Sequence, residues 1–277
     1  MSGQRSSFAG GDQPYLRDVQ YRDPARLAQR ANLHATYSTA DIAWHAWVSA
    51  VYELRASMDV LEAGCGAGWT WAEAATPLPS GISLVLTDLS PGMVETAVER
   101  ARQTGQFASV TGWTADLQDL PIEADRYDRI IANHMLYHLP DPGRGVAELA
   151  RVVTADGLVV AATNGHRHMR ELWAIRADVF GLSEIDATIE AFGADTGFTI
   201  LREHFGDIRW RRFEDELHCT DADDVLAYIC STPPGENASQ EERRQLRDKI
   251  REAIDAGDGV LRVTKDVGCF VCREPLR

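Results

Sequence analysis

Short apolar runs alternate with stretches of helical spacing through the first two thirds of the chain. The pattern predicts strands at 58–63, 82–87, 108–113, 127–133 and 157–163. It predicts helices at 90–105 and 142–153, and the Ser90-Pro91 pair is typical of a helix start. Alternating strands and helices favour a parallel sheet covered on both faces. We therefore expect an α/β fold with a Rossmann-like, doubly wound sheet.

The pattern changes after the fifth predicted strand. Apolar residues at helical spacing over 165–195 predict one or two inserted helices. Four later segments follow: strands at 207–219 and 263–273, and helices at 221–229 and 240–254, with Pro233-Pro234-Gly235 as the break between the helices. The two late strands predict a long antiparallel pair. The expected sheet is therefore seven-stranded and mostly parallel, with an antiparallel last strand.

The segment before the first strand is rich in aromatic side chains. We predict that residues 1–57 form an N-terminal helical cap, and that residues 58–277 form the main domain with a helical insertion over 165–200. The cap is expected to fold over a ligand site. A simpler alternative is an amphipathic helix that packs on the domain, because Leu27, Ala31 and His34 share helical spacing.

The clearest chemical signal is the stretch 59–68, Asp-Val-Leu-Glu-Ala-Gly-Cys-Gly-Ala-Gly. An apolar strand runs into an acidic residue and a G-x-G-x-G turn, where missing Cβ atoms let a ligand approach the backbone. A dinucleotide site places a third glycine three residues after the second, but that position is Trp69. The turn therefore indicates an adenosine-type cofactor other than a dinucleotide, and an ordinary tight strand-to-helix turn is the structural alternative.

Two more predicted strands end in an acidic residue. Asp88 closes the run 81–88, about where a carboxylate that binds ribose hydroxyls is expected. Asp116 follows the run 110–115. A carboxylate at the end of a buried strand needs a partner, because an unpaired buried charge is costly. Three acidic strand ends in succession favour a ligand site along one edge of the sheet.

These motifs resemble the class I S-adenosylmethionine-dependent methyltransferases. The similarity runs through 60–68, 86–93, 115–121, 127–141 and 148–153, and it is dense over 58–164. The resemblance implies that residues 58–277 form a class I methyltransferase domain that uses S-adenosylmethionine and yields S-adenosylhomocysteine.

The resemblance also implies a set of contacts to the methionine part of the cofactor. Glu62 is expected near the methionine amine, and Gly64, Gly66 and Gly68 are expected beneath the methionyl and ribose portions. Asn133, at the end of the fourth strand, is expected to face the methionyl end.

The adenosine part has its own implied contacts. Asp88 is expected to hold the ribose hydroxyls, with Leu89 and Met93 packed at the adenine. Asp116 is expected to accept from the exocyclic amine, and the Leu117 backbone to meet the ring. Met93 has a structural alternative, because a methionine on a helix is more often part of the core.

The cap and the loops after the strands carry the remaining candidates. In related small-molecule methyltransferases an N-terminal segment closes the site through tyrosine contacts and an arginine near the methionine carboxylate, which implies roles for Tyr21 and Arg30. Methyl transfer is an in-line displacement that needs alignment and exclusion of water, and an oxygen or nitrogen acceptor benefits from a general base. We predict that His138, Tyr21 or His166 serves as the proton acceptor, with ordinary loop or capping histidines as the alternative.

Charge and composition narrow the class of partner. The formal net charge of −14 argues against a large phosphate-binding surface, and residues 133–136 read Asn-His-Met-Leu instead of the Asn-Pro-Pro-Tyr type of DNA amino-methyltransferases. No run approaches the length of a membrane span, and Met1–Gly11 lacks the apolar core of a secretory signal. We therefore expect no nucleic-acid or membrane partner and a cytoplasmic location. A homodimer is left open.

Cysteine usage agrees with a reducing compartment. The five cysteines are expected to be reduced thiols, and Cys269 and Cys272 lie three apart in a predicted strand, so that their side chains point to opposite faces. With no second Cys-x-x-Cys pair, we expect no zinc site and no other metal.

The class of methyl acceptor is inferred from a resemblance to a branch of the family. The segment before the first strand and the runs 162–169 and 228–231 resemble a bacterial branch that includes methyltransferases of specialised metabolism, within which indole carbon methylation is known. We therefore expect a small aromatic acceptor, with an indole carbon preferred and O- or N-methylation of another aromatic metabolite as the alternative. Two other classes remain: a binding protein that keeps the cofactor fold without transfer, and an NAD-dependent oxidoreductase, which Trp69 disfavours.

Overall fold

Seven strands form one mixed sheet in the order β3-β2-β1-β4-β5-β7-β6. The computed structural model of the chain describes residue 9, residues 11–22 and residues 25–277. The strands are β1 (Asp59–Ala63), β2 (Ser83–Asp88), β3 (Ser109–Thr114), β4 (Tyr127–Asn133), β5 (Val153–Asn164), β6 (Phe205–Cys219) and β7 (Leu261–Pro275). The pairs among β1–β5 are parallel, whereas β7 is antiparallel to both β5 and β6. The predicted fold class is confirmed.

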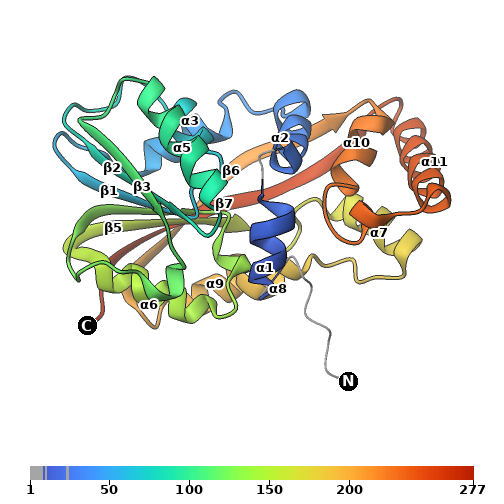
Figure 1. Ribbon diagram of the computed structural model, residues 1–277. Coiled ribbons are helices and arrows are strands. Elements are labelled where there is room, and N and C mark those ends of the chain that lie inside the picture. The colour runs from blue at the N-terminus through green and yellow to red at the C-terminus, as the bar shows by residue number, and fades with distance from the viewer. Residues whose placement is uncertain (1–8, 10, 23–24) are drawn as a thin grey trace.

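Helices cover both faces of this sheet (Figure 1). They are α1 (Gln13–Tyr15), α2 (Ala25–Tyr37), α3 (Trp44–Val51), α4 (Trp69–Ala72), α5 (Pro91–Gln103), α6 (Pro142–Val152), α7 (Arg170–Phe180), α8 (Ala187–Phe192), α9 (Ala194–Leu201), α10 (Ala222–Ile229) and α11 (Gln240–Ala256). One buried cluster joins the sheet to α3, α4 and α5, and another joins its opposite face to α6, α8 and α9.

The helices that flank the strand ends begin and end where their sequence predicts. The Ser90 hydroxyl accepts from the Met93 amide, and Pro91 occupies the first turn of α5, where its missing N–H costs nothing. The chain leaves α5 through Gly105 at φ +65°. The Asp141 carboxylate caps α6 in the same way, by accepting from the Arg144 amide. These caps place the N-termini of α5 and α6 at the edge where β2 and β4 end.

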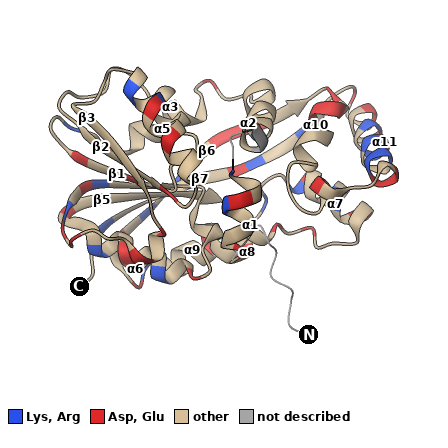
Figure 2. Ribbon diagram, in the orientation of Figure 1, with Lys and Arg blue, Asp and Glu red and all other residues tan. Residues whose placement is uncertain are grey.

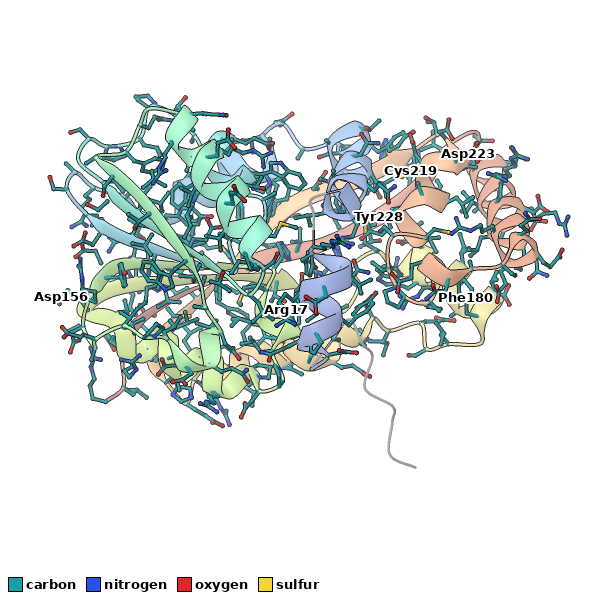
Figure 3. The ribbon with its side chains drawn as sticks, viewed as in Figure 1. Arg17, Asp156, Phe180, Cys219, Asp223 and Tyr228 are labelled. Carbon is teal, nitrogen blue, oxygen red and sulfur yellow. The ribbon has the colours of Figure 1, made fainter. Side chains whose placement is uncertain are left out.

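The long β6–β7 ribbon extends past the end of its neighbour in the sheet. β5 pairs with β7 only along 267–272, whereas β6 and β7 remain paired through 214–219 and 261–266. The projecting part packs with α2, α7, α10 and α11 around a third buried cluster. We call α7, α10, α11 and the projecting ribbon the distal lobe. Figure 3 labels Phe180, Cys219 and Tyr228 there, and Asp156 at the opposite end of the molecule.

The predicted helical insertion over 165–200 divides between the two parts of the molecule. Its first helix, α7, belongs to the distal lobe, whereas α8 and α9 pack on the main sheet beside α6. The helices predicted at 221–229 and 240–254 are present as α10 and α11, and they complete the distal lobe.

Three expectations about the surface and the cysteines can be compared with the structure. Cys272 belongs to the cluster beneath α6 and Cys269 to the cluster beneath α5, so they face opposite sides of the sheet as predicted. None of the helices among the described residues combines the length and the apolar character that crossing a bilayer requires.

The expectation about surface charge concerns a large basic surface. Figure 2 shows basic side chains interleaved with acidic ones along α11. The prediction for Met1–Gly11 falls mostly outside the described residues.

Candidate active site

A cavity of about 800 Å³ runs from the ends of β1, β2 and β4 toward the distal lobe. Its walls at the sheet edge include Glu62, Gly66, Asp88, Asp116 and Asn133, all from the edge where the parallel strands end. Its other walls come from α2, the turn before α7, β6, β7 and α10. A crevice at the carboxyl ends of parallel strands is where open α/β sheets bind their ligands. The predicted strand-end residues therefore share one cavity.

The glycine turn is left-handed at all three glycines, with φ values of +67°, +50° and +73° at Gly64, Gly66 and Gly68. A Cβ on Gly68 would lie 2.7 Å from the Ala97 Cα, so this glycine lets α5 pack against the turn. A Cβ on Gly66 would meet only Leu27 at 3.5 Å, because this glycine faces the cavity. The turn thus presents bare backbone to a ligand.

Asp88 is a partly buried carboxylate at the end of β2. Its Oδ2 accepts from the Gly66 amide at 3.0 Å and its Oδ1 accepts from the Ser90 amide at 2.9 Å. Burial raises the pKa of this carboxyl, and the backbone hydrogen bonds oppose that shift. Each oxygen has a further lone pair. Asp88 can therefore accept hydrogen bonds from two ribose hydroxyls while it holds the glycine turn in place.

Glu62 lies deeper, at the end of β1, and is 1% exposed. The Trp71 indole donates to its Oε2 at 2.6 Å, and burial raises its pKa to about 8. The carboxyl is therefore mostly protonated at neutral pH until a cation approaches it. A methionine ammonium would supply that cation.

Asp116 and Leu117 line the cavity next to Leu89. Asp116 accepts from the Gln13 amide at 2.8 Å and from the Gln118 backbone, which brings α1 onto the site. Met93 differs from its prediction. Its side chain is fully buried and does not line the cavity, because position 93 faces the interior in the first turn of α5.

Asn133 ends β4 at the middle of the cavity. Its Nδ2 donates to the Tyr52 hydroxyl at 2.6 Å, whereas its Oδ1 is buried with no partner among the described residues. A buried amide oxygen without a partner is uncommon and points to a missing ligand group. The glycine turn, Asp88 and this oxygen together fit the ribose and methionyl parts of S-adenosylmethionine.

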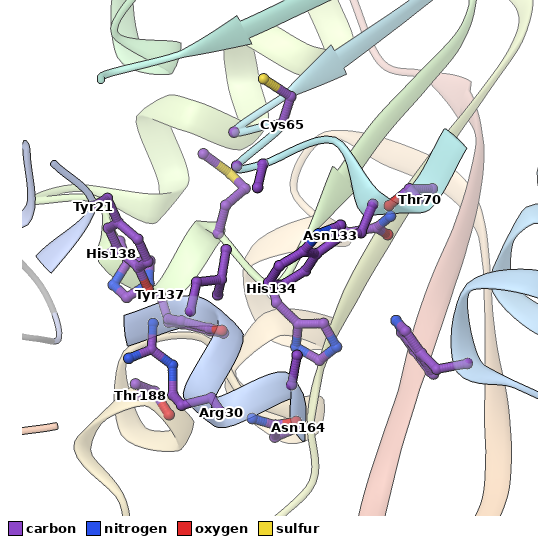
Figure 4. Close-up of a pocket in the computed structure, with 18 of the residues that line it drawn as sticks. Tyr21, Arg30, Cys65, Thr70, Asn133, His134, Tyr137, His138, Asn164 and Thr188 are labelled. Atoms are coloured by element: carbon purple, nitrogen blue, oxygen red, sulfur yellow. The ribbon is translucent and has the colours of Figure 1, made fainter. Parts of the chain in front are cut away.

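Tyr21 and His138 meet across the cavity. The Tyr21 hydroxyl lies 2.9 Å from His138 Nε2, and the two rings pack edge to face, as Figure 4 shows. Tyr137 packs against His138 with ring centroids 4.6 Å apart. Arg30 lies over the Tyr21 ring at 5.6 Å and donates to the Ser231 carbonyl. The structure thus brings together three of the predicted residues, Tyr21, Arg30 and His138.

His166 lies apart from them. It is exposed on the turn before α7 and does not line the cavity, whereas His168 from the same turn is buried and does. The turn is fixed by two backbone hydrogen bonds to β7, Gly165 N to Asp266 O and Met169 N to Thr264 O. This attachment turns His168 inward and leaves His166 in solvent.

Asp215 and Lys265 were not predicted from the sequence. They are directly paired on β6 and β7, they line the cavity, and their side chains are 2% and 7% exposed. Each interrupts an apolar row of period two, between Phe213 and Leu217 in one strand and between Val263 and Val267 in the other. A charge at the inward positions of two pairing strands is the sequence signal that could have identified them.

Three histidines surround this pair without adding charge. His34, His134 and His168 all line the cavity. Burial lowers the pKa of His134 to about 3, and it holds those of His34 and His168 well below the usual value. His134 has φ +52°, a left-handed conformation that is costly for a residue with a Cβ. Within residues 9, 11–22 and 25–277, no group of three or more His, Cys, Asp or Glu side chains is gathered to hold a metal.

A family model and several known proteins match the part of the chain that forms the parallel strands and their ends. A sequence model described as Methyltransferase domain matches residues 61–161. "Methyltransferase GfsG" from Streptomyces halstedii is 32% identical over 40% of this chain and 39% of its own length. "Ubiquinone/menaquinone biosynthesis C-methyltransferase UbiE" from Citrifermentans bemidjiense is 25% identical over 43% of this chain and 51% of its own length. The chain thus spans about half, or less, of these relatives.

A solved structure extends the similarity to almost the whole chain. The cyclase SpnF superimposes with a TM-score of 0.58 over 98% of this chain and 100% of its own, at 15% sequence identity. At that identity the likeness concerns the fold alone.

Proposed function

Because this chain carries a methyltransferase domain and belongs to the class I S-adenosylmethionine-dependent methyltransferases, we propose that it methylates a small aromatic metabolite bound in the cavity. S-adenosylmethionine supplies an electrophilic methyl group on a sulfonium. The protein then has to align the acceptor with that methyl group and exclude water.

The observation that carries the proposal is the continuity of one cavity. Asp88 and the bare backbone of Gly66 line one part of it, and the same space continues past Asn133 to walls from α2, β6, β7 and α10. A cofactor held at the glycine turn therefore leaves room beyond its methionyl end. The proposed roles are those expected above: Glu62 for the amine, Asp88 for the ribose, and Asp116 and Leu117 for the adenine.

The aromatic character of the acceptor rests on the far walls. Besides Trp69 at the glycine turn, six aromatic side chains line the cavity: Tyr21, Trp44, Tyr137, Trp173, Phe213 and Tyr228. Such walls suit a flat, electron-rich ring through stacking and edge contacts. The Tyr21–His138 pair would accept the proton that an indole carbon loses after methylation. The word C-methyltransferase in the name of the relative from C. bemidjiense is in keeping with a carbon acceptor.

The same walls would suit an oxygen or nitrogen acceptor on another aromatic metabolite. In that case the Tyr21–His138 pair would take the proton before or during transfer. The cyclase SpnF shares this fold, so the fold leaves the reaction itself to be measured. A small acceptor is preferred over nucleic acid because the net charge is −14.

We propose that residues 1–57 act as the cap and 58–277 as the methyltransferase domain. Gln13 reaches Asp116 at 2.8 Å, and Thr39 donates its amide to the Glu216 carbonyl of β6 at 3.0 Å, so the segment is bonded to both ends of the cavity. Deletion of residues 1–40 is expected to abolish transfer while the sheet remains folded, as checked by circular dichroism. Full activity of the truncated protein would reject the role of a lid.

The proposed function is tested by product mass. Purified protein is incubated with methyl-labelled S-adenosylmethionine and a panel of indoles, phenols and aromatic amines, and S-adenosylhomocysteine and NAD binding are measured by calorimetry. A labelled product establishes transfer, and fragmentation assigns it to carbon, oxygen or nitrogen. Asp88→Ala is the matched inactive control.

Each other result counts against a stated part of the proposal. Tight S-adenosylhomocysteine binding without any product across a wide panel would favour a non-catalytic binding protein. A preference for NAD would overturn the cofactor assignment.

A further inference from the structure

Lys265 places an ammonium group inside the acceptor end of the cavity. It lies at the point where the β6–β7 ribbon leaves the sheet, one pleat beyond Val267, the last residue of β7 that pairs with β5 on this side. Its Nζ donates to His34 Nδ1 at 3.0 Å. An ammonium carries three protons, so this hydrogen bond leaves protons for another acceptor.

The paired carboxylate does not take up those protons fully. Asp215 Oδ2 is 3.8 Å from the ammonium, which is long for a hydrogen bond. Asp215 Oδ1 accepts from the Ser38 hydroxyl and from the Thr39, Ala40 and Glu216 amides, at 2.8–3.2 Å. Asp215 thus anchors the end of α2 to β6 and balances Lys265 at a distance.

His34 adds a second donor. It accepts at Nδ1 from a group that can only donate, and a neutral imidazole carries one proton, so that proton is on Nε2. Burial keeps the pKa of His34 well below its usual value, so the ring stays neutral. Lys265 and His34 therefore form one donor pair with a single positive charge.

Polar atoms without partners lie on the same walls. Asn164 Oδ1, His168 Nδ1 and Trp173 Nε1 are buried without hydrogen bonds to any described residue, and all three residues line the cavity. Trp173 packs beside Tyr228, which in turn meets the His34 ring edge to face at 5.6 Å. An aromatic ring carrying an acidic group would pack on this wall and place its oxygen at the donor pair.

We propose that Lys265 and His34 form a subsite that binds an anionic oxygen of the methyl acceptor, supplied by a carboxylate or by an ionised phenol. The proposal rests on the proposed function, because the subsite belongs to the acceptor half of that cavity. It makes Lys265 a determinant of acceptor specificity. A neutral ring of the same shape would add no negative charge at the ammonium beyond that of Asp215.

The surroundings of Lys265 define how the subsite responds to pH. The titratable groups that face it are Asp215 from β6, His34 from α2, His134 from the loop after β4 and His168 from the turn before α7. Asp266, the next residue, points to the other face of the ribbon and pairs with Arg212. Burial lowers the pKa of Lys265 to about 8. Binding of an anion is expected to raise it.

The chain offers a direct readout, because Lys249 and Lys265 are its only lysines. Lysine labelled with carbon-13 at Cε gives two resonances, and Lys249→Met identifies them without altering the cavity. Full-length protein saturated with S-adenosylhomocysteine is titrated with indoleacetate and, in parallel, with neutral indoleacetamide. We expect indoleacetate alone to raise the pKa of Lys265, while Lys249 on the surface does not respond.

The affinities of the same two compounds for the wild type and for Lys265→Met test whether Lys265 selects the anion. We expect indoleacetate to bind about ten- to a hundredfold more tightly than indoleacetamide in the wild type and in Lys249→Met, and the preference to disappear in Lys265→Met. For the phenol source, para-nitrophenol is compared with para-nitroaniline. Binding at the subsite should lower the pKa of para-nitrophenol, so that the coloured, ionised form appears at a lower pH than it does in solution. This shift should occur only when Lys265 is present.

The two arms separate the sources of the oxygen. A response to indoleacetate alone assigns a carboxylate, and a response to para-nitrophenol alone assigns a phenol. If Lys265 responds to neither anion in protein that binds S-adenosylhomocysteine, or if the preference survives in Lys265→Met, the proposal is wrong. Loss of S-adenosylhomocysteine binding by the wild type would instead overturn the proposed function.

Discussion

The two ends of the cavity satisfy their polar groups in different ways. At the cofactor end, both oxygens of Asp88 accept backbone amides from the adjoining turn and helix start. At the acceptor end, the Lys265 ammonium depends on His34 and Asp215, which belong to other elements, and nearby Asn164 Oδ1 has no partner among the described residues. Asp88 is therefore held by the sheet edge itself, whereas Lys265 is held only by side chains that other elements bring to it.

The difference separates the part of the molecule that the family model matches from the part that we propose selects the acceptor. A site held by backbone amides follows from the strand–turn–helix path, so any chain with that path can build it. A site held by side chains from separate elements depends on how α2 and the distal lobe close over the sheet. The family match at 61–161 covers the first kind of site and omits Lys265.

The largest expected effect concerns the proton acceptor between the two ends. His138→Ala should lower turnover by about a hundred- to ten-thousandfold, the range of general-base catalysis, with S-adenosylhomocysteine affinity nearly unchanged. Single-turnover kinetics and calorimetry measure the two quantities, and His218→Ala, at a partly exposed histidine on β6, is the matched control. Normal turnover at every pH would remove His138 from the chemistry. The same assay on His166→Ala tests the prediction for that exposed residue.

Asp88→Ala tests the cofactor end. Loss of two hydrogen bonds to a charged acceptor should weaken S-adenosylhomocysteine binding by about 2–4 kcal/mol. The variant also leaves the Gly66 and Ser90 amides without an acceptor, so thermal unfolding is measured in parallel with calorimetry. Lys265→Met should keep the cofactor affinity of the wild type. If both variants lost cofactor affinity equally, the division into two ends would be wrong.

Lys265→Met tests the acceptor end through stability. The pKa of Lys265 is lowered to about 8 in the folded protein, whereas an unfolded lysine stays protonated to about 10.4. Below about pH 8 the lysine is charged in both states, and the folded state bears the cost of burying the charge. Because the Asp215 carboxylate keeps four hydrogen-bond donors of its own, the variant should raise the free energy of unfolding at about pH 7 by about 1–3 kcal/mol.

The pH dependence gives a second reading of the same variant. Wild-type stability should gain a contribution between about pH 8 and 10, where the unfolded chain binds the proton and the folded one does not. That gain should vanish in Lys265→Met and persist in Lys249→Met. Urea unfolding at several pH values measures both. Destabilisation of Lys265→Met at neutral pH would indicate a structural role for the lysine.

The smallest effect is a proton released when the cofactor binds. The pKa of Glu62 is raised to about 8 by burial, so the carboxyl is protonated at about pH 7 and should ionise beside the methionine ammonium. Ionising it at that pH costs about 1.4 kcal/mol. Calorimetry in buffers of different ionisation enthalpy should detect about one proton, and Glu62→Gln should abolish the release. No release from the wild type would place the amine elsewhere.

The sequence predicted residues at the cofactor end of the cavity, but it did not predict Lys265 and His34 at the acceptor end. Glu62, Asp88 and Asn133 could be placed because each ends a strand, and the ends of parallel strands meet at one edge. Met93 lies in the core, which was its structural alternative, and helical position alone does not say which way the first turn of α5 faces. Lys265 and His34 come together only through the antiparallel ribbon and the position of α2, contacts between segments more than two hundred residues apart.

The projecting β6–β7 ribbon also defines a joint for protein engineering. Its strands leave the sheet together, beyond Phe213 and Val267, and the part past that line is attached by the β6–β7 register, by the turn before α7 and by the end of α2. A homologous lobe grafted at these positions would keep the pleat that turns position 265 inward. Exchange of the lobe would thus change the choice of acceptor, while the glycine turn would stay the same.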